Sequence, residues 1–325
     1  MSRQCMVDPT KREAGRYYTE RNPFVLRAFK KWARAYDIAN DVILEPFAGK
    51  NNLIDMLDKL GYCRRFRSFD IKPADPDVDR RDTIASFPGG YRTCVSNPPW
   101  LGKYSCKRRG LPWPNIAYDD LYKHCLELAL ENCENVGFII PATFLHWWSG
   151  LSRQYGLDDH LGKRLESVTF LNSKVFSDTD NPVCMALFGS KKQQDVSIYY
   201  DNNCVGTHDE LKEHLPGEAS ERIRFNVKNG SLGLVGIDDT TGPTIRFCKG
   251  SEIASNVQHS SRSLTRIDYK MTSSQIADLN AKFQKFRKDT HDVFLTPFKG
   301  LRKDGRYRRR LDYGLAREIL CKYAS

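Results

Sequence analysis

The stretch DVILEPFAG, residues 41–49, decides the fold class of this chain. Its first half is an apolar run that is typical of a buried strand, and its second half is a loop that ends in glycine. Residues 53–60 then place their apolar side chains on one side of a helical pattern. A strand, a loop of small residues and a helix form the nucleotide-binding edge of an open α/β sheet. At Gly49 a ligand can approach the backbone closely, because glycine has no side chain.

Three carboxylates follow this pattern in order along the chain. Glu45 ends the first predicted strand and can accept a hydrogen bond from an ammonium or a hydroxyl group. Asp70 ends a second predicted strand about twenty residues later, where such folds bind ribose hydroxyls. Asp82 follows and can accept from the amino group of a bound adenine. Each acid alone is typical of a solvated surface, but this order indicates a nucleotide-like ligand.

A second informative stretch is the tetrapeptide NPPW, residues 97–100, which follows the short apolar run TCVS. The prolines have no N–H group and hold φ near one value, so the turn is stiff and its carbonyls stay free. Asn97 offers a side-chain oxygen as an acceptor, and Trp100 offers a flat aromatic face. Together they can grip a planar ring that carries an exocyclic amino group. The alternative is a rigid turn beside a core tryptophan.

With both stretches in this order, the sequence resembles the DNA adenine-N6 methyltransferases that use S-adenosylmethionine. In that family an acidic-Pro-Phe-x-Gly-x-Gly loop binds the methionine part of the cofactor, and an Asn-Pro-Pro-aromatic tetrapeptide carries the chemistry. The resemblance covers about residues 13–190. It implies cofactor-binding roles for Glu45, Phe47, Gly49, Asp70 and Asp82, and catalytic roles for Asn97, Pro98, Pro99 and Trp100.

Two further positions take their expected roles from the resemblance alone. The segment that contains Tyr18 and Thr19 is similar to the Gly-x-Tyr-Phe-Thr-Pro segment that folds over the cofactor, which implies that both residues contact it. Phe176 matches the position at which relatives place an aromatic ring against the flipped base, beside Trp100. Plain packing in the core is the alternative for Tyr18 and Phe176.

The cofactor loop departs from the family pattern, because it reads Gly49-Lys50-Asn51 where the family has Gly-x-Gly. Asparagine tolerates left-handed φ angles better than most residues other than glycine. We therefore expect the turn to survive. The departure also leaves open a non-enzymatic alternative, a binding subunit whose cofactor loop has decayed.

The order of the patterns predicts two domains. Strands and helices alternate to about residue 190, which predicts a Rossmann-like methyltransferase sheet, mostly parallel, with helices on both faces. Short strand patterns and glycines follow, so we expect a catalytic domain in residues 1–192 and a smaller α+β target-recognition region in residues 193–325. Recognition is expected there because the stretch between Gly49 and Asn97 is too short to hold it.

The positive charge is concentrated near the C-terminal end. The chain carries a net charge of +11, of which residues 240–325 contribute +10. Nucleic acid is the natural partner of such a surface, and a solvated basic tail is the alternative. A loop over residues 104–114 is expected at the mouth of the site. The cations expected to contact nucleic acid are Lys107, Arg108 and Arg109 in that loop, and Arg302, Lys303, Arg306, Arg308, Arg309 and Arg310.

The sequence therefore predicts a site-specific methyltransferase that transfers a methyl group from S-adenosylmethionine to adenine N6 of a flipped base in DNA. RNA adenine-N6 transfer is the first alternative, and protein-glutamine or cytosine-N4 transfer follows. The family resemblance is consistent with a cytoplasmic monomer, encoded by a bacterium or a phage, and allows a cognate restriction endonuclease as a partner. The ten cysteines show no zinc-like spacing and no run of 18 apolar residues occurs, so we expect neither a metal nor a membrane partner.

Overall fold

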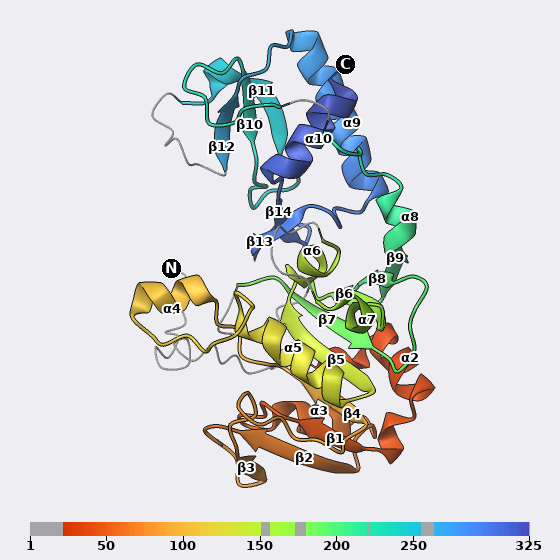
Figure 1. The fold of residues 1–325 in the computed structure, drawn as a ribbon. Coiled ribbons are helices and arrows are strands. Elements are labelled where there is room, and N and C mark those ends of the chain that lie inside the picture. Colours follow the sequence, from red (N-terminus) through yellow and green to blue (C-terminus); the bar gives the residue numbers. More distant parts are fainter. Residues whose placement is uncertain (1–21, 151–156, 173–179, 220–221, 255–262, 325) are drawn as a thin grey trace. The chain divides into compact units, whose positions relative to one another are not determined.

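The computed structural model describes residues 22–150, 157–172, 180–219, 222–254 and 263–324 (Figure 1). The chain divides into two compact units, one up to Gly206 and the other from Thr207 on. The sequence-based boundary lay at residue 192. Residues after it join the first unit because β8 (Ser197–Tyr200) and β9 (Asn203–Thr207) extend its sheet.

The first unit is built on a nine-stranded sheet. In sheet order its strands are β3 (Val78–Arg80), β2 (Arg65–Asp70), β1 (Val42–Glu45), β4 (Thr93–Ser96), β5 (Asn135–Pro141), β7 (Val183–Phe188), β6 (Leu165–Phe170), β8 and β9. Strands β3, β2, β1, β4 and β5 run parallel, whereas β7 is antiparallel to both of its neighbours. This order confirms the predicted Rossmann-like α/β class.

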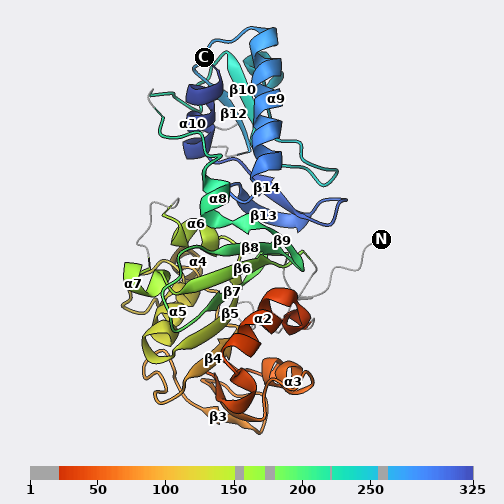
Figure 2. The ribbon, with the colours of Figure 1, turned by 90° about the vertical axis from the view of Figure 1, so that its right-hand side faces the viewer.

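Helices cover both faces of this sheet. Figure 2 shows α2 and α3 on one face and α5 and α7 on the other. The helical elements of the unit are η1 (Pro23–Val25), α2 (Arg27–Ala35), η2 (Ile38–Asn40), α3 (Asn52–Asp58), α4 (Lys103–Arg109), α5 (Leu121–Asn132), α6 (Phe144–Trp148) and α7 (Asp159–Gly162). Because both faces are covered, the central strands are apolar throughout: all four residues of β4 are buried.

Helix α2 illustrates how the sequence fixes this packing. Ala28, Phe29, Trp32 and Ala33 recur at helical spacing, and all four are buried. The Trp32 indole N–H donates to the carbonyl of Phe188 at 3.0 Å, so the ring is anchored on β7. The opposite side of the helix is left to solvent.

The second unit combines a three-stranded antiparallel sheet, a two-stranded hairpin and helices, as predicted for an α+β region. Its elements are α8 (His208–Lys212), β10 (Leu232–Val235), β11 (Arg246–Lys249), η3 (Gly250–Glu252), β12 (Leu264–Ile267), α9 (Ser273–Asp289), β13 (Thr296–Leu301), β14 (Tyr307–Arg310) and α10 (Tyr313–Tyr323). The Asn280 amide of α9 both donates to and accepts from the Phe247 backbone on β11. Among the described residues, no helix has the length and apolarity needed to cross a bilayer.

Candidate functional site

The carboxyl ends of three neighbouring strands meet at one edge of the large sheet. Glu45, Asp70 and Ser96 are the last residues of β1, β2 and β4. The ends are staggered by a short step, since Glu45 lies opposite Ser68 and Leu44 lies opposite Cys94, so β2 extends two residues and β4 one residue beyond the level of Glu45. From β1 the chain passes outward through β2 to β3 and then crosses back to β4 on the other side of β1, so the strand order reverses here, and open α/β sheets bind ligands at such a point.

Glu45 is the most deeply buried acid of this edge, at 1% exposure. Its Oε1 accepts from the Ser96 hydroxyl at 2.5 Å and from the Phe47 N–H at 3.1 Å. Within the described residues its Oε2 is buried and accepts no hydrogen bond. Burial, together with the charge of Asp70, raises the pKa of Glu45 to about 8. A buried carboxyl oxygen without a donor fits a cationic group placed beside it.

The loop after β1 is held in a left-handed turn. Gly49 adopts φ +55° and donates its N–H to Asp70 Oδ2 at 3.0 Å. Asn51 adopts φ +61°, so the expected survival of the turn at this departure from the family pattern is confirmed. The buried Asn51 side chain turns towards β2 and accepts from the Ser68 hydroxyl at 2.7 Å. The loop is therefore pinned to the strand that ends in Asp70.

The remaining two acids stand beside this loop. Asp70 Oδ1 accepts from the Lys72 N–H at 2.8 Å, and a carboxylate has about four acceptor sites, so further donors can be accommodated. Asp82 is exposed and accepts from the Ala85 N–H at 3.1 Å. Its neighbour Thr83 donates its hydroxyl to the Pro46 carbonyl at 2.8 Å. The structure thus brings the three acids and the loop together.

The tetrapeptide leaves β4 directly beside Glu45. Asn97 and Pro99 are half-buried, and Pro98 is buried. Within the described part of the chain, no group donates to the Pro98 carbonyl. Trp100 is only 6% exposed, so the structure does not present the open indole face that the sequence suggested. A base can stack on this ring only after neighbouring side chains move apart.

Residues 103–109 form helix α4, so the loop predicted over this stretch is wrong there. The helix ends at Gly110, which adopts φ +67°, and its last turn holds Lys107, Arg108 and Arg109. Cations are favourable at a helix C-terminus because of the helix dipole. All three are exposed, and Tyr104 on the same helix is 77% exposed. The predicted cations therefore remain at the surface, on a helix that stands clear of the sheet in Figure 1.

Arg302 and Arg309 require a correction, because the structure buries both in the second unit, at 5% and 3% exposure. The Arg302 guanidinium donates to Asp238 at 3.0 Å and to Asp292 at 3.3 Å. Arg287 donates to the same two carboxylates. Burial alone would raise the pKa of Asp292, but hydrogen bonds from Arg287 hold it below its usual range. These arginines hold the unit together and are not surface contacts.

The hairpin geometry explains which basic residues face outward. Side chains alternate between the two faces of a strand. In β14, Tyr307 and Arg309 are buried, whereas Arg308 and Arg310 are half-exposed. In the turn before this strand, Lys303 is exposed and Arg306 is half-exposed.

Three of the residues predicted from the sequence fall in parts of the chain that the structure does not describe. Tyr18, Thr19 and Phe176 lie outside the described residues. Two exposed features have no counterpart among the residues predicted from the sequence: Tyr104 on α4 and the cations of α2. The signal for the latter was available, since the basic residues of α2 recur at the helical spacing opposite to the apolar ones.

In comparisons with known proteins, no family model matches the chain, and no curated protein matches it. Among solved structures it is similar to a protein from Listeria monocytogenes named as a class I S-adenosylmethionine-dependent methyltransferase, at 13% identity and TM-score 0.40, over 55% of this chain and 64% of that one. It is similar to the methyltransferase subunit of a type I restriction-modification system from Streptococcus thermophilus, at 12% identity and TM-score 0.38, over 58% and 49%. It is also similar to the M protein of the type I restriction enzyme EcoKI, at 11% identity and TM-score 0.38, over 85% and 72%.

This chain spans less than two thirds of the length of the first two of these proteins. The strand order and register of the large sheet themselves show the α/β fold class.

Proposed function

We propose that this protein transfers a methyl group from S-adenosylmethionine to adenine N6 in DNA. The observation that carries the proposal is the 2.5 Å hydrogen bond from Ser96 to Glu45. It joins the end of β1 to the residue directly before Asn97, and so couples the acidic cofactor loop to the tetrapeptide. A cofactor on this loop would lie beside a ring held by the tetrapeptide.

The residues at the sheet edge fit the proposed cofactor. The buried Glu45 Oε2 would accept from the ammonium of its methionine part, and Asp70 from its ribose hydroxyls. Asp82 would accept from its adenine amino group. Phe47 is half-buried beside the left-handed turn at Gly49, where the backbone is open to close approach. Tyr18 and Thr19 remain proposed contacts. When bound, the cofactor supplies a methyl group on a sulfonium.

The tetrapeptide would make the adenine amino group reactive. This nitrogen is a weak nucleophile because its lone pair is delocalised into the ring. The Asn97 side-chain oxygen and the Pro98 carbonyl would each accept one N–H, which draws the nitrogen towards tetrahedral geometry and frees the lone pair. The bound cofactor would supply the methyl group as an electrophile, and the methylated amino group would release a proton to water. Positioning supplies most of the acceleration.

The target base must leave the DNA stack to reach this edge. Unstacking costs a few kcal/mol, and stacking on an aromatic ring returns about 1–3 kcal/mol per base. Trp100, and Phe176 beyond the described residues, are the proposed rings. Because Trp100 is 6% exposed, base entry would be coupled to movement of the side chains that cover the indole.

Exposed and half-exposed cations would contact the phosphates. On the first unit these are Lys107, Arg108 and Arg109 of α4, and on the second they are Lys303, Arg306, Arg308 and Arg310. The two buried arginines of the hairpin are left out of this set. The second unit, rich in exposed cations near its end, is proposed as the region that reads the target.

The test is methyl incorporation. Purified protein is incubated with S-adenosylmethionine that carries a radioactive methyl group and with either duplex DNA or RNA, and digested products are analysed for N6-methyladenine. We expect label in DNA as N6-methyladenine. Label in RNA would support the RNA alternative, and label in cytosine or in protein would replace the proposed acceptor.

A further inference from the structure

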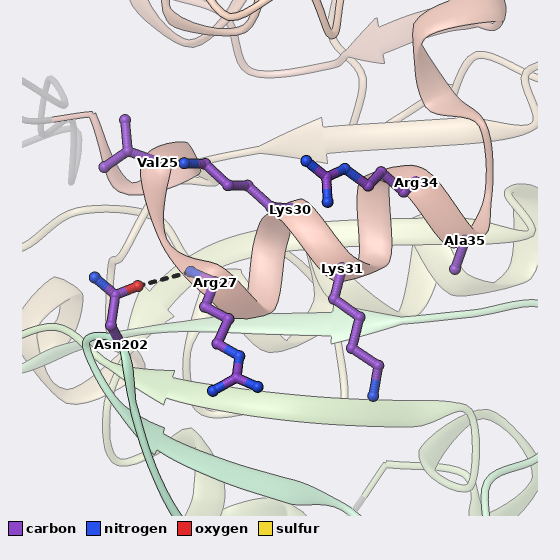
Figure 3. A pocket seen from close by; sticks show the side chains of 7 residues that line it. All are labelled: Val25, Arg27, Lys30, Lys31, Arg34, Ala35 and Asn202. Carbon is purple, nitrogen blue, oxygen red and sulfur yellow. Dashed lines mark hydrogen bonds between the residues drawn. The ribbon is translucent and has the colours of Figure 1, made fainter.

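Helix α2 exposes a basic stripe on the face opposite to its buried residues. Its sequence RAFKKWARA contains four cations and no acid. Arg27, Lys30, Lys31 and Arg34 recur at i, i+3, i+4 and i+7, so they share one face. Figure 3 shows Arg27 and Lys31 extending to one side of the helix axis and Lys30 and Arg34 to the other.

No acid in the described part of the chain neutralises this stripe. None of the four side chains forms an ion pair or a hydrogen bond there. The charge of Lys31 acts to lower the pKa of Glu166, but the two residues form no ion pair. The Glu166 carboxylate instead accepts hydrogen bonds from Tyr36 and Gln193. Among the described residues, therefore, no paired carboxylate offsets the charge of the stripe.

The stripe lines a groove of about 720 Å³ whose charged side chains are all cations. At one end the Asn202 Oδ1 accepts from the Arg27 backbone N–H at 2.8 Å (Figure 3), so this acceptor is already occupied, and the amide NH2 of Asn202 is a donor. The remaining lining residues are Val25 and Ala35, which have apolar side chains. A surface that offers cations and N–H donors but no carboxylate is complementary to a ligand made of anionic acceptors.

We propose that α2 binds the phosphodiester backbone of DNA. From Arg27 to Arg34 the helix rises about 10 Å, and one DNA strand carries a phosphate about every 3.4 Å measured along the duplex axis, so the stripe spans the axial length of about three phosphates. Arg27, Lys31 and Arg34 are exposed, and Lys30 is half-buried. Cations spread along a helix suit a polyanion that releases condensed counterions better than a single small anion. The choice of DNA rests on the proposed function, whereas the contact itself needs no methyl transfer.

The experiment measures binding of a fluorescent duplex by anisotropy across a series of salt concentrations, without cofactor. The test variant is R27Q/K30Q/K31Q/R34Q. The matched control neutralises four other exposed cations of the first unit, K59Q/R64Q/K191Q/K192Q. We expect the test variant to lose at least about tenfold in affinity at low salt, and its slope of log K against log salt to fall by about 2–3, with a smaller change in the control.

A second variant separates charge from folding. R27K/K30R/K31R/R34K keeps every charge and should keep the wild-type salt slope. Equal affinity and slope in the wild type and the neutralised variant would overturn the proposal, as would equal losses in the test and control variants. If α2 governs DNA binding but the wild type transfers no methyl group to DNA, the proposed function fails while this inference stands.

Discussion

Asn97 stands at the point where the strand that ends beside Glu45 gives way to a stiff double-proline turn. Its amide oxygen is the one side-chain acceptor of the tetrapeptide. We expect Asn97→Ala to lower methyl transfer at least about hundredfold, the loss typical of removing one preorganised hydrogen-bonding group from a transition state. Cofactor binding, measured by calorimetric titration, should remain because it depends on the other loop.

A matched control for this variant is Asn203→Ala, which removes an exposed amide at the start of β9. It should transfer at the wild-type rate. Full activity in Asn97→Ala, or a parallel loss of cofactor binding, would remove Asn97 from the proposed catalytic role.

Glu45 should make cofactor binding depend on pH. Burial raises the pKa of Glu45 from 4.5 to about 8, so between these values the folded protein holds a proton that the unfolded chain releases. Protonation of Glu45 therefore contributes to stability fully below pH 4.5, and this contribution is lost as the pH rises through about 8. A cofactor ammonium favours the ionised carboxylate. Affinity for S-adenosylmethionine should therefore rise between pH 5.5 and 7 by up to about tenfold per unit, with proton release.

Calorimetric titrations in two buffers of different ionisation enthalpy measure that proton release directly. Glu45→Gln cannot ionise, so its affinity should be weaker and independent of pH over the same range. A wild-type affinity that does not change with pH, or an equal pH slope in both proteins, would contradict the assignment.

At the scale of elements, two neighbouring residues of the hairpin should behave in opposite ways. Lys303 is exposed, whereas Arg302 is buried against Asp238 and Asp292. We expect Lys303→Gln to reduce the salt slope of DNA binding by about 0.9 and to leave the melting temperature unchanged. Arg302→Gln should lower the free energy of unfolding by about 3–5 kcal/mol, because it breaks a buried ion pair.

Thermal unfolding and anisotropy on the same samples provide the comparison. If Arg302→Gln were as stable as the wild type and lost affinity as Lys303→Gln does, the hairpin would present Arg302 to the ligand and the burial argument would fail.

Much of the first unit could be predicted because its elements are local. The apolar runs that became β1 and β4 are buried strands, and the acids follow the strand ends to which periodicity assigned them. The left-handed turn at Asn51 was also predictable, because it depends on the conformational range of one residue. Local chemistry therefore gives the sheet edge and the position of its loops.

The errors concern features that local chemistry does not determine. Arg302 and Arg309 belong to a basic run that looks solvated, but both are buried by distant partners: the Arg302 guanidinium donates to Asp238, more than sixty positions away, and the Arg309 guanidinium donates to the Leu295 carbonyl. The helix at Lys103–Arg109 has few apolar residues, so periodicity gives no signal for it. The burial of Trp100 likewise depends on packing by segments distant in sequence.

At the scale of the whole molecule, each of the two units has its own core. The first is organised by the large sheet, and the second by α9, its small sheet and the buried cluster of Asp238, Arg287, Asp292 and Arg302. All members of that cluster belong to the second unit. The proposed cofactor residues all belong to the first. Cofactor binding and stability of the second unit should therefore be separable by mutation.

Asp238→Ala is the change that tests this separation. Asp238 is fully buried and accepts hydrogen bonds from Arg287 and Arg302. Its removal deprives two buried guanidinium groups of the carboxylate that they share, which should lower the free energy of unfolding of the second unit by about 3–5 kcal/mol. Differential scanning calorimetry should show one transition moved to lower temperature. The other transition should stay in place, and saturating S-adenosylmethionine should still raise it. A single transition that moves as a whole, with cofactor binding lost, would mean that the two units unfold as one.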